Sequence, residues 1–301
     1  MINTQQELDR LLSTSRDKGI PTGIRELDEF TYGFRPGNLI ILGGVSSSGK
    51  TSLMTDFILA ASEHVGVGVF SIEMGDEVVR RAVYNLADLN FHRCQNKRTK
   101  SEEERFQRAI VQYKKLHSVY MDSTAFTLYP DWRLSREVPS NSMEGAMDRM
   151  YQAGARIFFI DYVQLLQWGN KIESEALRLK EITGKLHALS LKYKVPIIAL
   201  SQLTKATADR ATKKDMDPTP TLSDLRDSGF LVNDADIILL LHRPEYYRKK
   251  QAGMELLADT SESAQIIIGK QRSGPTGMVE VTFRAYCMSF RDTEEIKDGL
   301  F

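Results

Sequence analysis

A glycine- and serine-rich segment ending in a lysine and a threonine, GGVSSSGKT, carries the clearest chemistry in the sequence. Four residues separate Gly44 from Gly49-Lys50-Thr51, which is the spacing of a phosphate-binding P-loop. The glycines let backbone N–H groups turn toward phosphate oxygens, and a helix that begins after the loop adds partial positive charge. Lys50 is expected to reach the β- and γ-phosphates of ATP or another nucleoside triphosphate, and the Thr51 hydroxyl to ligate Mg²⁺. The predicted nucleotide-binding residues are Gly44, Ser46, Ser47, Ser48, Gly49, Lys50, Thr51 and Ser52. The alternative is a simple flexible turn.

Three more polar residues stand where apolar runs end: Asp161 in RIFFID, Glu73 in VGVFSIEM and Gln202 in VPIIALSQL. The carboxyl ends of parallel strands meet at one edge of a sheet, so all three are expected beside the P-loop. Asp161 is predicted to hold Mg²⁺, usually through water. Glu73 is predicted to orient and deprotonate the attacking water, and its alternative is a helix N-cap or an acid in the first turn of a helix. Gln202 is predicted to bond the γ-phosphate and report its loss to the loop that follows.

A pair of cations follows another apolar run near the C-terminus, in IIIGKQRSGPTG. Lys270 and Arg272 are one residue apart, so in an extended segment both side chains project from the same face. Gly274, Pro275 and Gly277 then predict a turn. We expect this pair to lie away from its own P-loop and to approach the γ-phosphate of a neighbouring copy, with Arg272 as an arginine finger. The alternative is two solvated cations on a hairpin.

The hydrophobic pattern predicts the elements that position these residues. Apolar runs suited to a sheet buried on both faces alternate with segments of helical period, which predicts an α/β fold: a mostly parallel, twisted sheet with helices on both faces. The predicted strands are 38–43, 65–72, 119–121, 157–160, 195–201, 237–242, 264–270 and 278–283. The predicted helices begin after Lys50 and cover 76–89, 102–117, 143–153 and 173–194.

Two stretches interrupt this alternation. Residues 128–141 carry two prolines and predict a surface insertion. Residues 203–221 predict a long polar loop, and loops of this length in a compact domain are usually functional or mobile. Its cations, which are candidates for contact with nucleic-acid phosphates, are Lys205, Arg210, Lys213 and Lys214.

The composition sets broad limits. The chain has 301 residues with 40 basic and 40 acidic side chains, so any nucleic-acid contact must come from a local basic surface. The two cysteines form no spaced cluster, which favours a reduced cytoplasmic protein over a disulfide framework or a zinc site. No apolar stretch reaches the length of about 18 residues that a membrane span requires, and the N-terminus has no signal-peptide pattern.

Taken in order, the motifs GGVSSSGKT, FSIEM, IDYVQLL, ALSQL, LSDLRDSGFLVNDADIILLLHR and IIIGKQRSGPTG resemble the C-terminal motor domain of the DnaB-type replicative helicases. The resemblance runs from about Pro21 to about Arg291 and is most specific in SDLRDSG, DADIILLLHRPEYY and KQRSGPTG. It implies a RecA-like P-loop core and a homo-hexameric ring. Such a ring hydrolyses nucleoside triphosphates at subunit interfaces and moves 5′ to 3′ on single-stranded DNA.

The resemblance also assigns roles at individual positions. Arg226, Asp227 and Gly229, in LRDSG, fall where the family lines its channel and grips the DNA backbone. Lys270 and Arg272 fall where the family sends a lysine and an arginine finger into the neighbour's nucleotide site. The alternative for Arg226 is an ordinary surface pair with Asp224 or Asp227.

One departure concerns the N-terminus. Residues 1–20 predict a short linker helix ahead of a motor domain at 21–301, whereas bacterial members carry a separate helical domain that binds primase. We therefore expect a motor-only arrangement as in some phages or mobile elements, unless an N-terminal domain has been removed. Primase and a helicase loader remain expected partners of the family.

Two other functions remain open from the sequence. A recombination or repair ATPase of the RecA/RadA kind shares the same core but forms filaments. A RecA-like regulatory ATPase would lack DNA activity. The helicase interpretation is favoured by KQRSGPTG and LRDSG, and by the basic loop 205–214.

Overall fold

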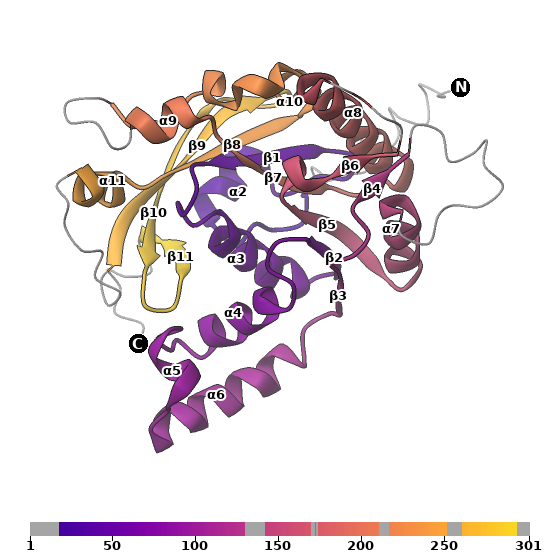
Figure 1. Cartoon of the computed structure of the whole chain (residues 1–301). Helices are drawn as coiled ribbons and strands as arrows, with labels where there is room; N and C mark the ends of the chain where they lie inside the picture. The colour runs from indigo at the N-terminus through magenta and orange to yellow at the C-terminus, as the bar shows by residue number, and fades with distance from the viewer. Residues whose placement is uncertain are drawn as a thin grey trace.

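A central nine-stranded sheet organises the chain in this computed structural model, which describes residues 18–129, 142–169, 172, 174–210, 217–251 and 261–293 (Figure 1). The order across the sheet is β11-β10-β9-β8-β1-β7-β5-β2-β3. Its strands are β1 (Leu39–Gly44), β2 (Gly66–Ser71), β3 (Val119–Asp122), β5 (Ala155–Asp161), β7 (Ile197–Gln202), β8 (Ile237–His242), β9 (Ser261–Gln271), β10 (Gly277–Arg284) and β11 (Ser289–Asp292). A second, two-stranded sheet pairs β4 (Thr127–Leu128) with β6 (Gln167–Trp168).

The main sheet has a parallel part and an antiparallel part. The strands from β8 to β3 are parallel, whereas β9, β10 and β11 continue the sheet as antiparallel neighbours. All eight predicted strands are present, and the predicted mostly parallel α/β sheet is confirmed. The carboxyl ends of β1, β2, β5 and β7 therefore lie at one edge.

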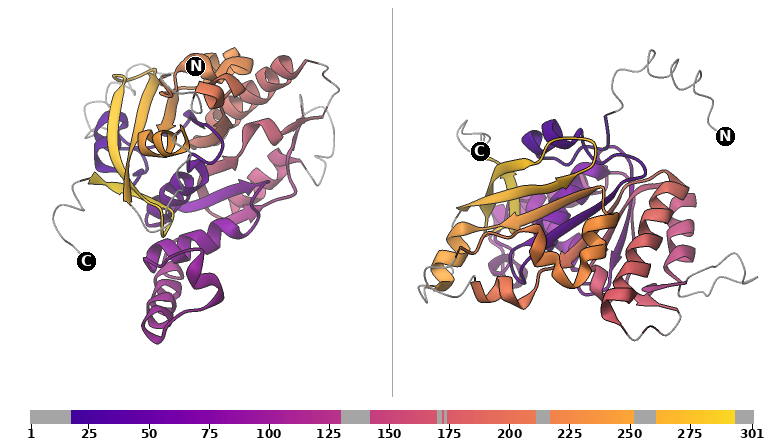
Figure 2. Two further views of the ribbon diagram at one scale, coloured as in Figure 1. Left: turned by 60° about the vertical axis from the view of Figure 1, so that its left-hand side comes forward. Right: turned by 90° about the horizontal axis from the view of Figure 1, so that it is seen from above.

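Helices cover both faces, because alternate side chains of each strand point to opposite sides. Ile40 and Leu42 face a core shared with α3 (Lys50–Ser62), whereas Leu39 and Ile41 face a core shared with α7 (Met143–Gln152) and α8 (Glu175–Tyr193). Figure 2 shows α7 and α8 together on one side of the sheet. The central strands are buried on both faces, which explains why their sequences are continuous apolar runs.

Three helices form an arm beside this core. They are α4 (Glu77–Leu86), α5 (Arg93–Asn96) and α6 (Lys100–Tyr113), and Figure 1 shows them together at the bottom of the view. The α6 helix begins with a capping box in which Thr99 and Glu102 satisfy each other's backbone N–H groups. Tyr84 and Phe91 lie in a small apolar core of their own within the arm.

Several elements differ from the sequence prediction. The predicted loop 203–221 contains a helix, α9 (Lys205–Arg210). Short elements that the sequence did not predict are α2 (Arg25–Thr31), α5, η1 (Val163–Leu165), η2 (Leu222–Ser228), α10 (Gly229–Asp234), α11 (Pro244–Gln251), β4, β6 and β11. The predicted linker helix at 1–20 falls almost wholly outside the described residues, as do positions 130–141 of the predicted insertion. None of the helices within the described ranges is long and apolar enough to cross a membrane.

Candidate active site

A cavity of about 310 Å³ opens at the edge where the carboxyl ends of the parallel strands meet. It brings together nine of the residues singled out in the sequence: Ser46, Ser47, Gly49, Lys50, Thr51, Ser52, Glu73, Asp161 and Gln202. Gly44 is the last residue of β1, and Ser48 lies in the loop that follows this strand. The other lining residues are Met74, Arg81, Tyr162, Arg243, Phe283 and Met288.

The loop between β1 and α3 has the backbone shape that phosphate binding requires. Gly49 caps α3 with φ 100°, a conformation that favours glycine, and a side chain there would come within 3.1 Å of the Phe290 ring. The N–H groups of the first helical turn have no acceptor within the helix, and they belong to residues that line the cavity. Ser48 Oγ is buried without a hydrogen-bond partner among the described residues. The loop therefore offers donors without competing acid in the first turn of α3.

Lys50 curls back over this loop. Its Nζ donates hydrogen bonds to the carbonyl oxygens of Gly44 at 2.8 Å and Val45 at 3.0 Å. Burial lowers the pKa of Lys50 to about 8, although the charges of Asp161 and Glu73 oppose the shift. The ammonium group is thus held against the loop. A phosphate bound by this loop would lie beside it.

Thr51 and Asp161 lie together on one side of the cavity. Thr51 Oγ1 donates a 2.9 Å hydrogen bond to Asp161 Oδ2, and Asp161 is almost fully buried at the end of β5. Burial raises the pKa of Asp161, opposed by the Thr51 hydrogen bond and by the charges of Lys50 and Arg81. Hydroxyl and carboxylate oxygens are the ligands that Mg²⁺ prefers, and this ion commonly takes one or two protein ligands with phosphate and water. The pair fits Mg²⁺ on those grounds.

Glu73 and Gln202 lie at the same cavity. Glu73 is exposed in the turn after β2, two residues beyond the strand end. Because α4 begins only at Glu77, with Asp76 at its N-cap position, Glu73 does not cap that helix. Gln202 is the last residue of β7, and its backbone N–H and C=O are both held by the side chain of Gln164, at 3.3 and 3.2 Å.

Two arginines at the cavity were absent from the sequence prediction. Arg81 is fixed by Glu77 through bonds of 2.9 and 2.7 Å, and its guanidinium also lies 5.4 Å from the Phe91 ring. Arg243 is buried and bonds Glu262 at 2.8 Å, with its guanidinium 3.9 Å from the Phe283 ring centroid. Arg243 directly follows β8, so the rule that strand ends carry site residues would have found it.

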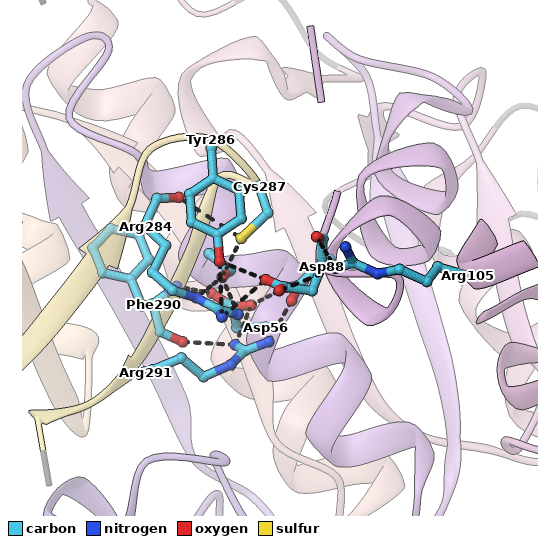
Figure 3. Close-up of polar contacts among 10 residues, drawn as sticks. Asp56, Asp88, Arg105, Arg284, Tyr286, Cys287, Phe290 and Arg291 are labelled. Atoms are coloured by element: carbon cyan, nitrogen blue, oxygen red, sulfur yellow. Dashed lines mark hydrogen bonds and ion pairs between the residues drawn. The ribbon is translucent and has the colours of Figure 1, made fainter. Parts of the chain in front are cut away.

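The remaining wall comes from the hairpin that joins β10 to β11. Phe283 and Phe290 pack against each other with ring centroids 4.7 Å apart, and Met288 reaches the cavity. Figure 3 shows how polar contacts fasten this hairpin to the rest of the chain. Tyr286 Oη donates to Asp88 Oδ1 at 2.5 Å, and Arg284 Nη1 donates to the same oxygen at 3.0 Å.

A second set of contacts in Figure 3 ties the hairpin to the P-loop helix. Asp56 of α3 accepts the Phe290 N–H at 2.7 Å and pairs with Arg291 at 3.2 Å. Burial raises the pKa of Asp56, opposed mainly by the charge of Arg291. Because Asp56 lies on α3, the wall carrying Met288 keeps a fixed position relative to the loop that precedes this helix.

Lys270 and Arg272 lie at the opposite edge of the sheet from this cavity. Lys270 is inside β9, opposite Ile238 of β8, and Ile237 of β8 pairs with Ile40 near the start of β1. The P-loop follows the other end of β1, a separation on the order of 15 Å along the strand. Neither cation can reach the cavity of its own chain from there.

The carboxyl end of α10 holds both cations. Lys270 Nζ donates to the carbonyl oxygens of Val232 at 2.5 Å, Asn233 at 3.1 Å and Ala235 at 2.7 Å. Arg272 donates to the Asn233 carbonyl at 2.8 Å and to Asp236 Oδ1 at 2.9 Å. Burial and the nearby Arg272 lower the pKa of Lys270. The two side chains share one face, as the sequence predicted.

The predicted DNA-contacting positions lie along α9, η2 and α10. Arg210 forms a two-pronged pair with Asp224 at 2.9 and 2.7 Å. Burial raises the pKa of Asp224, but Arg210 and further hydrogen bonds hold it below its ordinary value. Asp224, one of the two acids in the surface-pair alternative for Arg226, is thus paired with Arg210. The backbone places Lys205 in α9, Arg226 and Asp227 in η2 and Gly229 at the start of α10, and Lys213 and Lys214 fall outside the described residues.

Comparison with known proteins gives evidence on the family of this chain that is independent of the cavity geometry. Residues 19–292 match the family described as DnaB-like helicase C terminal domain. The replicative DNA helicase DnaB of Buchnera aphidicola is 32% identical over 285 residues, and that of Geobacillus stearothermophilus is 34% identical over 273. Among solved structures, one described as an ATPase domain superposes with a TM-score of 0.78 at 26% identity, covering 96% of each chain.

The match to the longer proteins is partial. This chain spans 57% of the Buchnera protein and 54% of the Geobacillus protein. A solved DnaB-like replicative helicase, described together with its interactions with primase, superposes with a TM-score of 0.79 at 26% identity over 67% of its chain.

Proposed function

Since the chain belongs to the family of DnaB-like helicase C-terminal domains, we propose that it is the ATP-driven motor of a replicative DNA helicase. The observation that carries this proposal is the cavity at the strand ends, where Lys50, Asp161 and Glu73 meet. That arrangement supports hydrolysis of nucleoside triphosphates by positioning and electrostatic stabilisation, which supply most of the catalysis of phosphoryl transfer.

Roles are proposed for the cavity residues that the sequence singled out. The P-loop N–H groups and Lys50 bind the β- and γ-phosphates, and Thr51 with Asp161 would hold Mg²⁺. Bound there, Mg²⁺ would neutralise negative charge on the phosphate oxygens. Glu73 orients the attacking water and takes its proton, and its exposure at the cavity leaves it free to meet that water. Gln202 senses the γ-phosphate, with its backbone fixed by Gln164.

Lys270 and Arg272 are proposed to complete the site of a neighbouring subunit. Their place at the far edge of the sheet supports this role, because a ring that stacks opposite edges would bring them to another copy's phosphates. Hydrolysis would then require assembly, and the proposed assembly is a homo-hexamer.

Single-stranded DNA is proposed to contact η2, the start of α10 and the basic loop. The candidate residues are Arg226, Asp227, Gly229, Lys205, Lys213 and Lys214, whereas Arg210 is better placed to fasten this segment through Asp224. Movement 5′ to 3′, cytoplasmic location, and primase and loader as partners are further proposals that follow from the family. The recombinase and regulatory alternatives keep the same cavity but predict filaments or no DNA dependence.

Unwinding of a forked DNA duplex tests this function directly. The chain should separate the strands only with hydrolysable nucleotide and Mg²⁺, and it should form closed rings with a non-hydrolysable analogue. The Lys50→Ala variant should bind no nucleotide tightly and unwind nothing. Filaments with strand-exchange activity would favour the recombinase alternative, and hydrolysis insensitive to DNA would favour the regulatory one.

A further inference from the structure

Asp236, the acid just before β8, connects Arg272 to the base of the strand that carries the P-loop. Its Oδ1 accepts from Arg272 Nη1 at 2.9 Å, and its Oδ2 accepts from the Leu39 N–H at 2.8 Å. His187 Nε2 lies 3.3 Å from the same Oδ2. Asp236 therefore contacts the residue that directly follows β9, the first residue of β1 and a residue of α8 with one buried carboxylate.

The backbone of Asp236 repeats both links. Its N–H donates to the Leu39 carbonyl at 2.8 Å, and its carbonyl accepts from the Arg272 N–H at 2.9 Å. A residue bonded through both its main chain and its side chain has little freedom to move. Leu39 is the first residue of β1, and the P-loop follows the last residue of the same strand. The guanidinium is thereby fixed relative to its own subunit's nucleotide site.

These contacts do not use all the hydrogen-bond donors of the Arg272 guanidinium. Arginine has five N–H donors in a planar fork, and the hydrogen bonds of Arg272 to Asp236 and α10 use Nη1 and Nη2 on the side that faces them. The side chain remains 45% exposed. Nε has no hydrogen-bond partner among the described residues, so it can donate to a phosphate oxygen while Asp236 and α10 hold Nη1 and Nη2.

We propose that Asp236 is a positioning residue that aims Arg272 at the neighbouring subunit's γ-phosphate. The inference rests on the proposed function, because it assumes that Arg272 acts across the interface. A misplacement of about 1 Å in a catalytic group can lower a rate about a hundredfold, so loss of this anchor should impair Arg272 strongly. The subunit's own P-loop should stay intact.

Asp236→Asn breaks the relevant contact selectively. The asparagine oxygen can still accept from the Leu39 N–H, but its NH₂ group then faces Arg272, donor against donor. The experiment compares steady-state ATP hydrolysis in three mixtures of exchanging subunits. The reference mixture combines Arg272→Ala, which keeps the P-loop, with Lys50→Ala, which keeps Arg272. The second mixture adds Asp236→Asn to the Lys50→Ala chain, and the third adds it to the Arg272→Ala chain.

The placement of Asp236→Asn decides the outcome. In the second mixture the altered chain must supply Arg272, so hydrolysis should fall at least tenfold below the reference. In the third mixture that chain supplies only the P-loop, so hydrolysis should match the reference. Equal losses in both would mean a merely structural role, and no loss in the second, or a gain there from a released arginine, would overturn the proposal. If the reference mixture itself is inactive, action across the interface fails, and this inference fails with it.

A second variant and a control guard against misfolding. Asp236→Glu keeps the charge but moves the carboxylate by one methylene group. If the position of the carboxylate matters, this variant should also lower hydrolysis when it is placed in the chain that supplies Arg272. His187→Gln changes another partner of the same carboxylate but keeps a donor for Oδ2. Placed in the Lys50→Ala chain, it should leave ATP hydrolysis of the mixture within about twofold of the reference. Thermal unfolding shows which of the variant chains are folded. If Asp236→Asn is not folded, the same three mixtures are compared with Asp236→Glu in its place.

Discussion

The hydroxyl of Thr51 donates a 2.9 Å hydrogen bond to Oδ2 of Asp161, joining two residues that are 110 positions apart in the sequence. The bond brings the first turn of the P-loop helix to the end of a buried strand. It places side by side two protein oxygens of the kind that Mg²⁺ prefers, so the proposed metal site and the proposed phosphate site share one wall of the cavity.

The first prediction concerns the metal. Asp161→Asn keeps an acceptor for Thr51 but removes the carboxylate charge, so the variant should still bind nucleotide without Mg²⁺. The gain in nucleotide affinity on adding Mg²⁺ should fall by about tenfold or more, because one carboxylate contact to the ion is lost. Fluorescent-nucleotide titrations with Mg²⁺ and with a chelator measure the ratio. An unchanged ratio would remove Asp161 from the metal site.

The second prediction concerns Glu73. Glu73→Gln keeps the shape and hydrogen-bonding capacity of the side chain but removes its basicity. Hydrolysis should fall by about 10²-fold or more, while the nucleotide dissociation constant changes by less than about threefold. Single-turnover hydrolysis and equilibrium binding separate the two effects. Near-normal turnover would assign the base to another residue.

The third prediction concerns the pH dependence of nucleotide binding. Burial holds the pKa of Lys50 at about 8 in the absence of ligand, and the phosphates require its charged form. Raising the pH through this pKa neutralises Lys50, so binding must take up a proton. The apparent affinity should therefore fall by about tenfold between pH 7 and pH 9.

Isothermal titration in buffers of different ionisation enthalpy measures both the affinity and the proton uptake. Lys50→Met is the matched control, because it should bind weakly with no such pH dependence. The same slope in this control would show that the titrating group lies elsewhere.

The fourth prediction concerns DNA. Arg226→Ala should weaken single-strand binding for all sequences and reduce the slope of log affinity against log salt by about one. Nucleotide affinity should stay unchanged. Arg80→Ala removes an equally charged residue from the exposed surface of α4 and serves as the control. Equal effects of the two substitutions would reduce the role of Arg226 to net charge.

The cavity could be predicted from the sequence because its parts follow local rules. The P-loop has a fixed spacing, and Asp161 and Gln202 end strands whose apolar runs identify them. Arg243 directly follows β8, as Glu73 follows a predicted strand, so the same strand-end rule could have found it although it was not singled out.

Other features depend on long-range packing. Met288 reaches the cavity because Asp56 and Asp88 fasten a hairpin that is more than 190 residues away in the chain, and no local pattern encodes that contact. The hydrogen bonds of Lys270 to carbonyl groups at the carboxyl end of α10 likewise depend on this helix, which has six residues and no clear hydrophobic period. The loop prediction for 203–221 missed α9 because short helices gain their stability from tertiary contacts rather than from sequence propensity.

The central claim is that each nucleotide site is completed by the next subunit, and a mixing experiment with Arg272→Ala and Lys50→Ala chains tests it most directly. Each chain alone should be inactive. In rings mixed at random in equal amounts, about one quarter of the interfaces pair an intact P-loop with an intact Arg272. Hydrolysis should therefore recover toward about one quarter of the wild-type rate if interfaces act independently. Demonstrated subunit exchange with no recovered hydrolysis at any mixing ratio would contradict the claim.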